Sequence, residues 1–267
     1  MTNQDKPKIG IGFFGIPRAS KITLPSILSN IIHPAQEIGE TIIHYHFYDH
    51  RHVYNPGANE NSELAPENYE LFDQFAGVLE SPEGVIERYG IERIKSYGDA
   101  WDNNYDSLKN LILQLHSLQQ VTKALLEESP DIVIFARPDL TYHDSMANEI
   151  TSILKDSKSV ARLPAWQWCG GYNDRFSICN KHAIKPYGLR LSQIDRYLDT
   201  YNSPLHSERL LQFALDSATI RVKPIQTRAS RVRTGGEIKN EKFNNAAALR
   251  RIRWRIREIS KTITLKI

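Results

Sequence analysis

The hydrophobic positions of residues 105–136 follow a helical spacing and then an uninterrupted run. From about Tyr105 to Glu128, apolar side chains recur every three or four residues, which predicts a long helix with one face on the core. After Ser129-Pro130, the residues Ile132 to Ala136 are all apolar, as in a strand buried on both faces of a parallel sheet. Helix, short loop and buried strand form the rhythm of a βαβ unit and predict an α/β fold.

Similar patterns elsewhere extend this fold. They predict a strand over Lys8 to Phe14, a helix around Leu24 to Ile32 with Pro25 in its first turn, a strand over Thr41 to Asp49, a loop from Arg51 to Tyr69, a helix from Glu208 to Ser217 and a strand from Ile220 to Ile225. The aromatic and glycine-rich segment from Ser159 to Tyr187 favours irregular or antiparallel structure. The fold class is therefore α/β, with a mostly parallel, Rossmann-type sheet flanked by helices.

Composition indicates the cellular location of the protein, and charge divides the chain into two parts. No stretch approaches the roughly 20 apolar residues of a membrane span, and residues 1–8 are polar, so we expect a cytoplasmic protein. Cys169 and Cys179 could form a disulfide, but two cysteines in a chain of 267 residues are usually both reduced. Residues 242–267 carry a net charge of +7, which leaves −4 for residues 1–241. We therefore expect a catalytic body over 1–241 and a basic tail over 242–267.

Two turns place cations after predicted strands. Gly15-Ile16-Pro17-Arg18 lacks both the Gly-x-Gly-x-x-Gly and the Walker pattern, but Arg18 at a helix start could hold a phosphate; a surface arginine is the equal alternative. Arg137-Pro138-Asp139 ends the buried strand abruptly with a cation and a carboxylate. Because ligands of open α/β sheets bind at the carboxyl ends of the strands, both turns are candidate binding segments.

Histidines and aromatic residues gather in two other segments. His44, His46, His50 and His52 could in principle bind zinc, but their spacing matches no closed site and a polar strand face is favoured. The loop Trp166 to Phe176 combines aromatic, amide and acidic side chains, which suits a carbohydrate pocket; an aromatic mini-core beneath a loop is the alternative. Glu208 at a helix start is explained either by catalysis or by electrostatic stabilisation of the helix.

The order of these motifs resembles a known family. Gly-Ile-Pro-Arg, Arg-Pro-Asp-Leu, Gly-Gly-Tyr-Asn-Asp-Arg-Phe and His-Ser-Glu-Arg-Leu-Leu follow one another over residues 8–235 as in bacterial GT-A-type glycosyltransferases of capsule, lipopolysaccharide and other surface-polysaccharide gene clusters. The resemblance implies a GT-A-like fold and a nucleotide-sugar donor at the carboxyl edge of the sheet. On this basis the donor-binding candidates are Gly15, Ile16, Arg18, Gln114, Arg137 and Asp139, and the acceptor-binding candidates are Trp168, Tyr172 and Asn173.

The implied reaction is displacement of a nucleoside diphosphate from the anomeric carbon by an acceptor hydroxyl. Asp174 is the first candidate for the catalytic base of an inverting enzyme, and Glu208 is the second. The usual Asp-x-Asp of the family is absent. A divalent cation, Mg²⁺ or Mn²⁺, held by Asp139 is one arrangement, and neutralisation of the diphosphate by Arg137 in its place is the other.

The tail predicts a basic amphipathic helix over about Ala248 to Ile259. Such a helix could lie on an anionic membrane surface and bring the enzyme to a lipid-linked acceptor, or it could dock on the body through its isoleucines; we expect no nucleic-acid partner. Two other functions share the sheet topology: a sugar-nucleotide nucleotidyltransferase and a carbohydrate-binding or assembly protein without turnover. The first would need a glycine-rich loop with a lysine, which Gly15-Ile16-Pro17-Arg18 does not supply.

Overall fold

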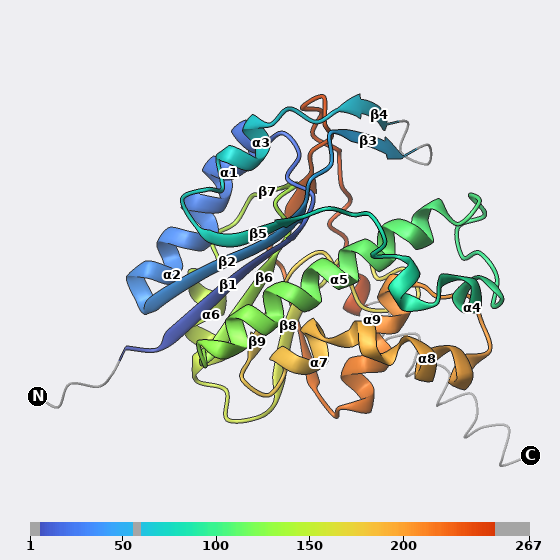
Figure 1. Ribbon diagram of the computed structural model, residues 1–267. Helices are drawn as coiled ribbons and strands as arrows, with labels where there is room; N and C mark the ends of the chain where they lie inside the picture. Colours follow the sequence, from blue (N-terminus) through green and yellow to red (C-terminus); the bar gives the residue numbers. More distant parts are fainter. Residues whose placement is uncertain (1–5, 56–59, 249–267) are drawn as a thin grey trace, which may run out of the picture.

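The computed structural model describes residues 6–55 and 60–248 and shows a central seven-stranded sheet (Figure 1). The strand order is β10-β8-β9-β6-β1-β2-β5. These strands are β1 (Lys8–Gly15), β2 (Glu40–Tyr48), β5 (Ala76–Glu80), β6 (Ile132–Ala136), β8 (Val160–Pro164), β9 (Ser177–Asn180) and β10 (Arg221–Ile225). All pairings are parallel except those of β9, which is antiparallel to β6 and β8. The predicted α/β class is confirmed, and the mostly parallel sheet flanked by helices is consistent with a GT-A-like fold.

Helices cover both faces of this sheet (Figure 1). On one face lie α1 (Ser20–Ile27), α2 (His33–Ile38) and α6 (Ala147–Leu154), which share a core with the odd-numbered apolar residues of β1. On the other face lie α5 (Asp106–Glu127), α7 (Ile184–Gly188) and α9 (Ser207–Ser217). A third cluster joins the start of α5 to α4 (Ile91–Lys95) and α8 (Ile194–Tyr201).

Gly12 has no side chain and so allows α5 to pack closely against β1. A Cβ at Gly12 would lie 3.0 Å from the Leu125 side chain and 3.3 Å from that of Val121. A larger residue would push the helix outwards, because such contacts are tighter than normal packing allows. The middle of α5 lies beside the carboxyl end of β1, where the Gly15 backbone N–H donates to the Ser117 hydroxyl at 2.9 Å.

The remaining elements are short. They are β3 (His52–Asn55), β4 (Glu60–Glu63), β7 (Leu140–Tyr142), β11 (Ala229–Arg231), α3 (Glu67–Glu70), a π-helical segment (Leu28–Ile32) and 3₁₀ segments (Glu87–Tyr89 and Arg190–Gln193). β3 pairs with β4 and β11 pairs with β7, each antiparallel. No helix of the described residues is long and apolar enough to cross a membrane.

Two predicted elements were wrong in detail. The segment from Arg51 to Tyr69 is not a plain loop, because it contains the β3–β4 hairpin and α3. The helix predicted to begin near Leu24 begins at Ser20, which places Pro25 inside α1 rather than in its first turn. Proline at this position cannot donate the usual backbone hydrogen bond, and the chain continues into the π-helical segment directly after α1.

Candidate functional site: an arginine-lined cavity at the carboxyl edge of the sheet

A cavity of about 510 Å³ lies where β1, β2 and β6 end. Gly15 at the end of β1, Tyr48 at the end of β2 and Arg137 directly after β6 all line it. Ligands of open α/β sheets bind at this edge, because loops and helix starts converge there. Of the predicted site residues, the structure brings seven into the cavity lining: Gly15, Ile16, Arg18, Gln114, Arg137, Asp174 and Glu208.

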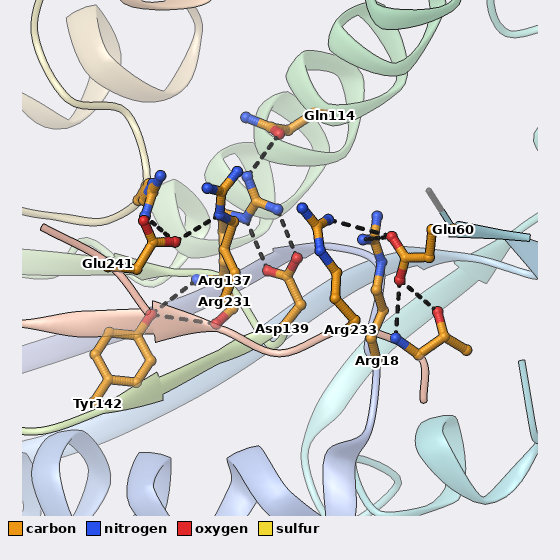
Figure 2. A network of polar contacts seen from close by, with 11 residues as sticks. Arg18, Glu60, Gln114, Arg137, Asp139, Tyr142, Arg231, Arg233 and Glu241 are labelled. Atoms are coloured by element: carbon orange, nitrogen blue, oxygen red, sulfur yellow. Dashed lines mark hydrogen bonds and ion pairs between the residues drawn. The ribbon is translucent and has the colours of Figure 1, made fainter. Parts of the chain in front are cut away.

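Arg137 and Asp139 form a bidentate pair at the centre of this region (Figure 2). Arg137 Nε donates to Asp139 Oδ1 at 2.9 Å, and Nη2 donates to Oδ2 at 2.7 Å. Gln114 Oε1 accepts from Arg137 Nη1 at 3.3 Å, while the Tyr142 hydroxyl bonds the backbone of Arg137. Burial opposes ionisation of Asp139, but the charge and hydrogen bonds of Arg137 outweigh it and lower the carboxyl pKa.

This pairing decides how Asp139 can act. Its side chain is almost completely buried, it is not among the residues that line the cavity, and both of its oxygens accept from Arg137. A divalent cation needs carboxylate oxygens that face the ligand, so this position does not fit the Mg²⁺ or Mn²⁺ site expected at Asp139. The guanidinium of Arg137 is presented to the cavity instead.

Glu60, on the β3–β4 hairpin, organises two further arginines (Figure 2). Its Oε2 accepts from Arg18 Nη1 at 2.9 Å and from Arg233 Nη1 at 3.3 Å, and its Oε1 accepts from the backbone and hydroxyl of Thr234. Although burial raises the pKa of Glu60, the charge of Arg18 and the bonds from Thr234 lower it below its ordinary value. Sequence patterns missed Glu60, because nothing local marks it as a partner of residues so far along the chain.

Glu241 has the same role for another pair of arginines. It accepts from Arg231 Nε and Gln167 Nε2, each at 2.7 Å, and it forms an ion pair with Arg175 at 2.9 Å. Burial works against its ionisation, but these partners lower the pKa of Glu241 to about 2. We call the five guanidiniums and their three carboxylates the arginine cluster; its members are Arg18, Arg137, Arg175, Arg231 and Arg233 with Glu60, Asp139 and Glu241.

Asp174 and Glu208 bring two carboxyl groups to the same cavity. Glu208 stands at the start of α9, and the loop before β9 reaches it because Gly171 has no side chain: a Cβ there would lie 2.0 Å from the Glu208 backbone oxygen. Burial, and next the charge of Asp174, raise the pKa of Glu208 to about 8. Its Oε2 is buried without a hydrogen-bond partner among the described residues. Both effects, burial and the charge of Asp174, favour the protonated form of Glu208.

The predicted acceptor residues are not among the residues that line the cavity. Asn173 is buried and bonds the Trp166 oxygen through Nδ2 at 2.8 Å, Trp168 Nε1 donates to the Pro164 oxygen at 2.6 Å, and the Tyr172 hydroxyl donates to Asp216 at 2.9 Å. These contacts give the loop its shape, as in the alternative of an aromatic mini-core. That shape places Asp174 and Arg175 in the cavity.

Other lining residues were not singled out as site residues from the sequence. Trp101 stacks on His206 at 5.3 Å between ring centroids, and Tyr48, His50, His52 and Arg175 also face the cavity. His50 and His52 belong to the histidine-rich segment, but among the described residues they join no metal-binding group. His46 lies outside the cavity lining, beside Glu80 and His116.

The basic tail lies mostly outside the described residues, so the predicted helix to Ile259 and its membrane contact stay predictions. Its described beginning packs on the body: the Phe243 ring lies 5.1 Å from that of Trp166, and Ala247 donates a backbone hydrogen bond to Ala165. Cys169 and Cys179 are both free.

Comparison with solved structures found distant structural neighbours. A crystal structure of mouse xyloside xylosyltransferase 1 in its apo form is similar over 83% of this chain and 85% of that chain, with a TM-score of 0.43 and 12% sequence identity. No family model and no curated protein matches the sequence. The neighbour is a xylosyltransferase by name, but at this level of similarity the fold rests on the strand order and the function proposed below on the cavity.

Proposed function

We propose that this protein is a glycosyltransferase that moves a sugar from a nucleoside-diphosphate sugar to a hydroxyl of a glycan or lipid-linked acceptor. The single observation that carries the proposal is the cavity at the carboxyl edge of the sheet, which combines five arginines with two carboxyl groups. The resemblance of the ordered sequence motifs supports surface-polysaccharide synthesis as the setting.

The charges of the arginine cluster support a diphosphate ligand. Five guanidiniums meet three carboxylates, which leaves an excess of two positive charges. The diphosphate of a sugar nucleotide carries about two negative charges, and arginine binds phosphate oxygens through paired N–H donors. The excess charge would also stabilise the diphosphate as it leaves, which is the requirement otherwise met by a metal ion.

The carboxyl groups supply the proton chemistry. For an inverting transfer, the acceptor oxygen forms a bond to the anomeric carbon as the bond from that carbon to the diphosphate oxygen breaks. Asp174 accepts the proton of the acceptor hydroxyl, and the diphosphate leaves with the electron pair of the broken bond. The protonated form of Glu208, which its raised pKa favours, can donate a hydrogen bond beside Asp174 without adding a second negative charge.

The two alternative functions, a nucleotidyltransferase and a carbohydrate-binding protein, would require different properties of the cavity. A nucleotidyltransferase would place a lysine of a glycine-rich loop on the phosphates, yet no lysine is among the described residues that line the cavity. A carbohydrate-binding or assembly protein would bind a sugar nucleotide and leave it intact.

The test is a binding and turnover screen with the full chain. Nucleoside diphosphates and their sugars are tested by thermal shift and calorimetry, and release of the nucleoside diphosphate is then measured with and without acceptors. Arg231→Gln should weaken binding of the diphosphate about tenfold or more, because one charged contact is lost. Arg228→Gln is the matched control, since Arg228 pairs with Asp144 and does not line the cavity. Absence of binding by any nucleoside diphosphate would contradict the proposal, and binding without turnover would favour the non-catalytic alternative.

A further inference from the structure

We propose a transition-metal site, best suited to Zn²⁺, formed by His46, Glu80 and His116. The three residues come from different elements: His46 from β2, Glu80 from the end of the edge strand β5, and His116 from the middle of α5. None of them lines the arginine-lined cavity, so this would be a second site, separate from that of the proposed sugar transfer.

The distances between the ligand atoms are close to those of a zinc site. Glu80 Oε2 lies 3.1 Å from His46 Nε2 and 2.9 Å from His116 Nε2, and the three groups offer atoms within 4.8 Å of one another. Zinc bonds of about 2.0–2.2 Å at tetrahedral angles separate ligand atoms by roughly 3.3–3.5 Å. A cation between the three groups therefore requires the carboxylate oxygen to move away from the two imidazole nitrogens by a few tenths of an ångström.

The surroundings hold the imidazole of His116 and the strand that carries His46 in place. His46 and His116 are each only 3% exposed. The Tyr89 hydroxyl lies 2.6 Å from His116 Nδ1, the ring nitrogen opposite to the proposed ligand atom, which is where proteins fix metal-binding histidines. The Ser117 hydroxyl donates to the backbone oxygen of His46 at 2.6 Å and fixes the strand that carries it.

A fourth ligand position is accessible. His46, Glu80 and His116 line a cavity of about 670 Å³ beside β5, through which a cation and a water molecule could enter. Gln120 also lines it, and its side-chain amide lies 3.3 Å from His116 Nε2. Two imidazoles, one carboxylate and one open position suit Zn²⁺ better than Mg²⁺ or Ca²⁺, which prefer oxygen ligands.

Such an ion would stabilise the edge strand β5 of the sheet. β5 has a neighbour in the seven-stranded sheet only on its β2 side, and most of its residues are exposed. A metal bonded to His46, Glu80 and His116 would tie this strand to β2 and α5, the two elements that bring Tyr48 and Gln114 to the arginine-lined cavity.

The test uses the full chain without a polyhistidine tag, freed of metal with a chelator and titrated with Zn²⁺ alone. We expect one equivalent to bind, with a rise in Tm, and Co²⁺ to give the visible absorption of a tetrahedral site. Glu80→Gln and His116→Gln should each weaken binding at least about tenfold. His44→Gln is the matched control, because His44 lines the same cavity outside the cluster.

Three outcomes would overturn the proposal: no saturable Zn²⁺ binding, binding equal in Glu80→Gln and His44→Gln, or displacement of Zn²⁺ by millimolar Mg²⁺. The first would identify the cluster as a hydrogen-bonded His–Glu–His group. If His116→Gln does not fold, Glu80→Gln decides alone, with its metal-free Tm as the check on folding.

Discussion

Arg137 and Glu208 line the same cavity, but Arg137 has a partner of opposite charge whereas Glu208 has a neighbour of like charge. Arg137, like the other guanidiniums of the arginine cluster, meets a carboxylate that the fold holds in place. Glu208 instead faces Asp174, a group of like charge, and one of its oxygens is buried without a hydrogen-bond partner in the described part of the chain. We call the arginine cluster the cationic region, and Asp174 with Glu208 the carboxyl region. The cationic region finds its partners within the protein, whereas the carboxyl region keeps hydrogen-bonding capacity that a substrate hydroxyl could use.

The largest expected effect tests the carboxyl region. Asp174→Asn should lower the rate of sugar transfer about 10²–10⁴-fold, because the acceptor loses its base, while binding of the nucleoside diphosphate changes little. Initial rates of nucleotide release measure the first quantity and calorimetry the second. Asp195→Asn is the control, because the Asp195 side chain on α8 is exposed. Unchanged turnover in Asp174→Asn would remove Asp174 from the reaction and leave Glu208 as the remaining carboxyl group.

The next effect tests the cationic region through stability. Arg137→Met should lower the free energy of unfolding by about 3–5 kcal/mol, since Asp139 is left buried without its partner. Urea unfolding measures the loss. The double variant Arg137→Met/Asp139→Leu should recover most of it, because no charge is then buried. Additive losses in the double variant would show that the pair is not the source of the effect.

The smallest expected effect is the pH dependence of stability that Glu208 gives to the carboxyl region. Because the folded-state pKa of Glu208 is about 8 and its ordinary value is 4.5, the folded chain binds more protons than the unfolded chain between these values. Stability should therefore fall as pH rises through this window. Glu208→Gln should raise the free energy of unfolding by at least about 1 kcal/mol at pH 9 and leave it nearly unchanged at pH 4.

Melting curves at the two pH values measure this difference, with exposed Glu87→Gln as the matched control. A gain that is the same at both pH values would mean that packing, rather than ionisation, limits stability at Glu208.

Elements with a strong local period could be predicted from the sequence. The apolar run of β6 and the apolar stripe of α5 depend on spacing within a few residues, and the structure confirms them. The position of Arg18 and Arg137 at the carboxyl edge followed from the same strands, because the end of a parallel strand fixes where the next residues lie.

Contacts between distant segments could not be predicted. The polar residues of the β3–β4 hairpin have the composition of a loop, and only the fold reveals that Glu60 is buried between two arginines. Likewise, Asn173 and Trp168 have the chemistry of a sugar pocket, but the Trp166 and Pro164 oxygens take their hydrogen bonds. In both cases tertiary partners decide the role of a side chain whose type alone permits several.

The bonds of Glu60 also determine when a binding site can exist during synthesis. Arg233 and Thr234 follow Glu60 by 173 and 174 residues, so the contacts that close this side of the cavity are among the most non-local in the chain. At about 5–20 residues per second, a ribosome needs on the order of ten to thirty seconds to make that interval. Strands β1, β2 and β6 can pair within that time, but the cavity they border gains its full set of arginines only afterwards. If the cavity binds a sugar nucleotide as proposed above, a nascent chain has no complete site until Arg233 and Thr234, which follow β11, have been added.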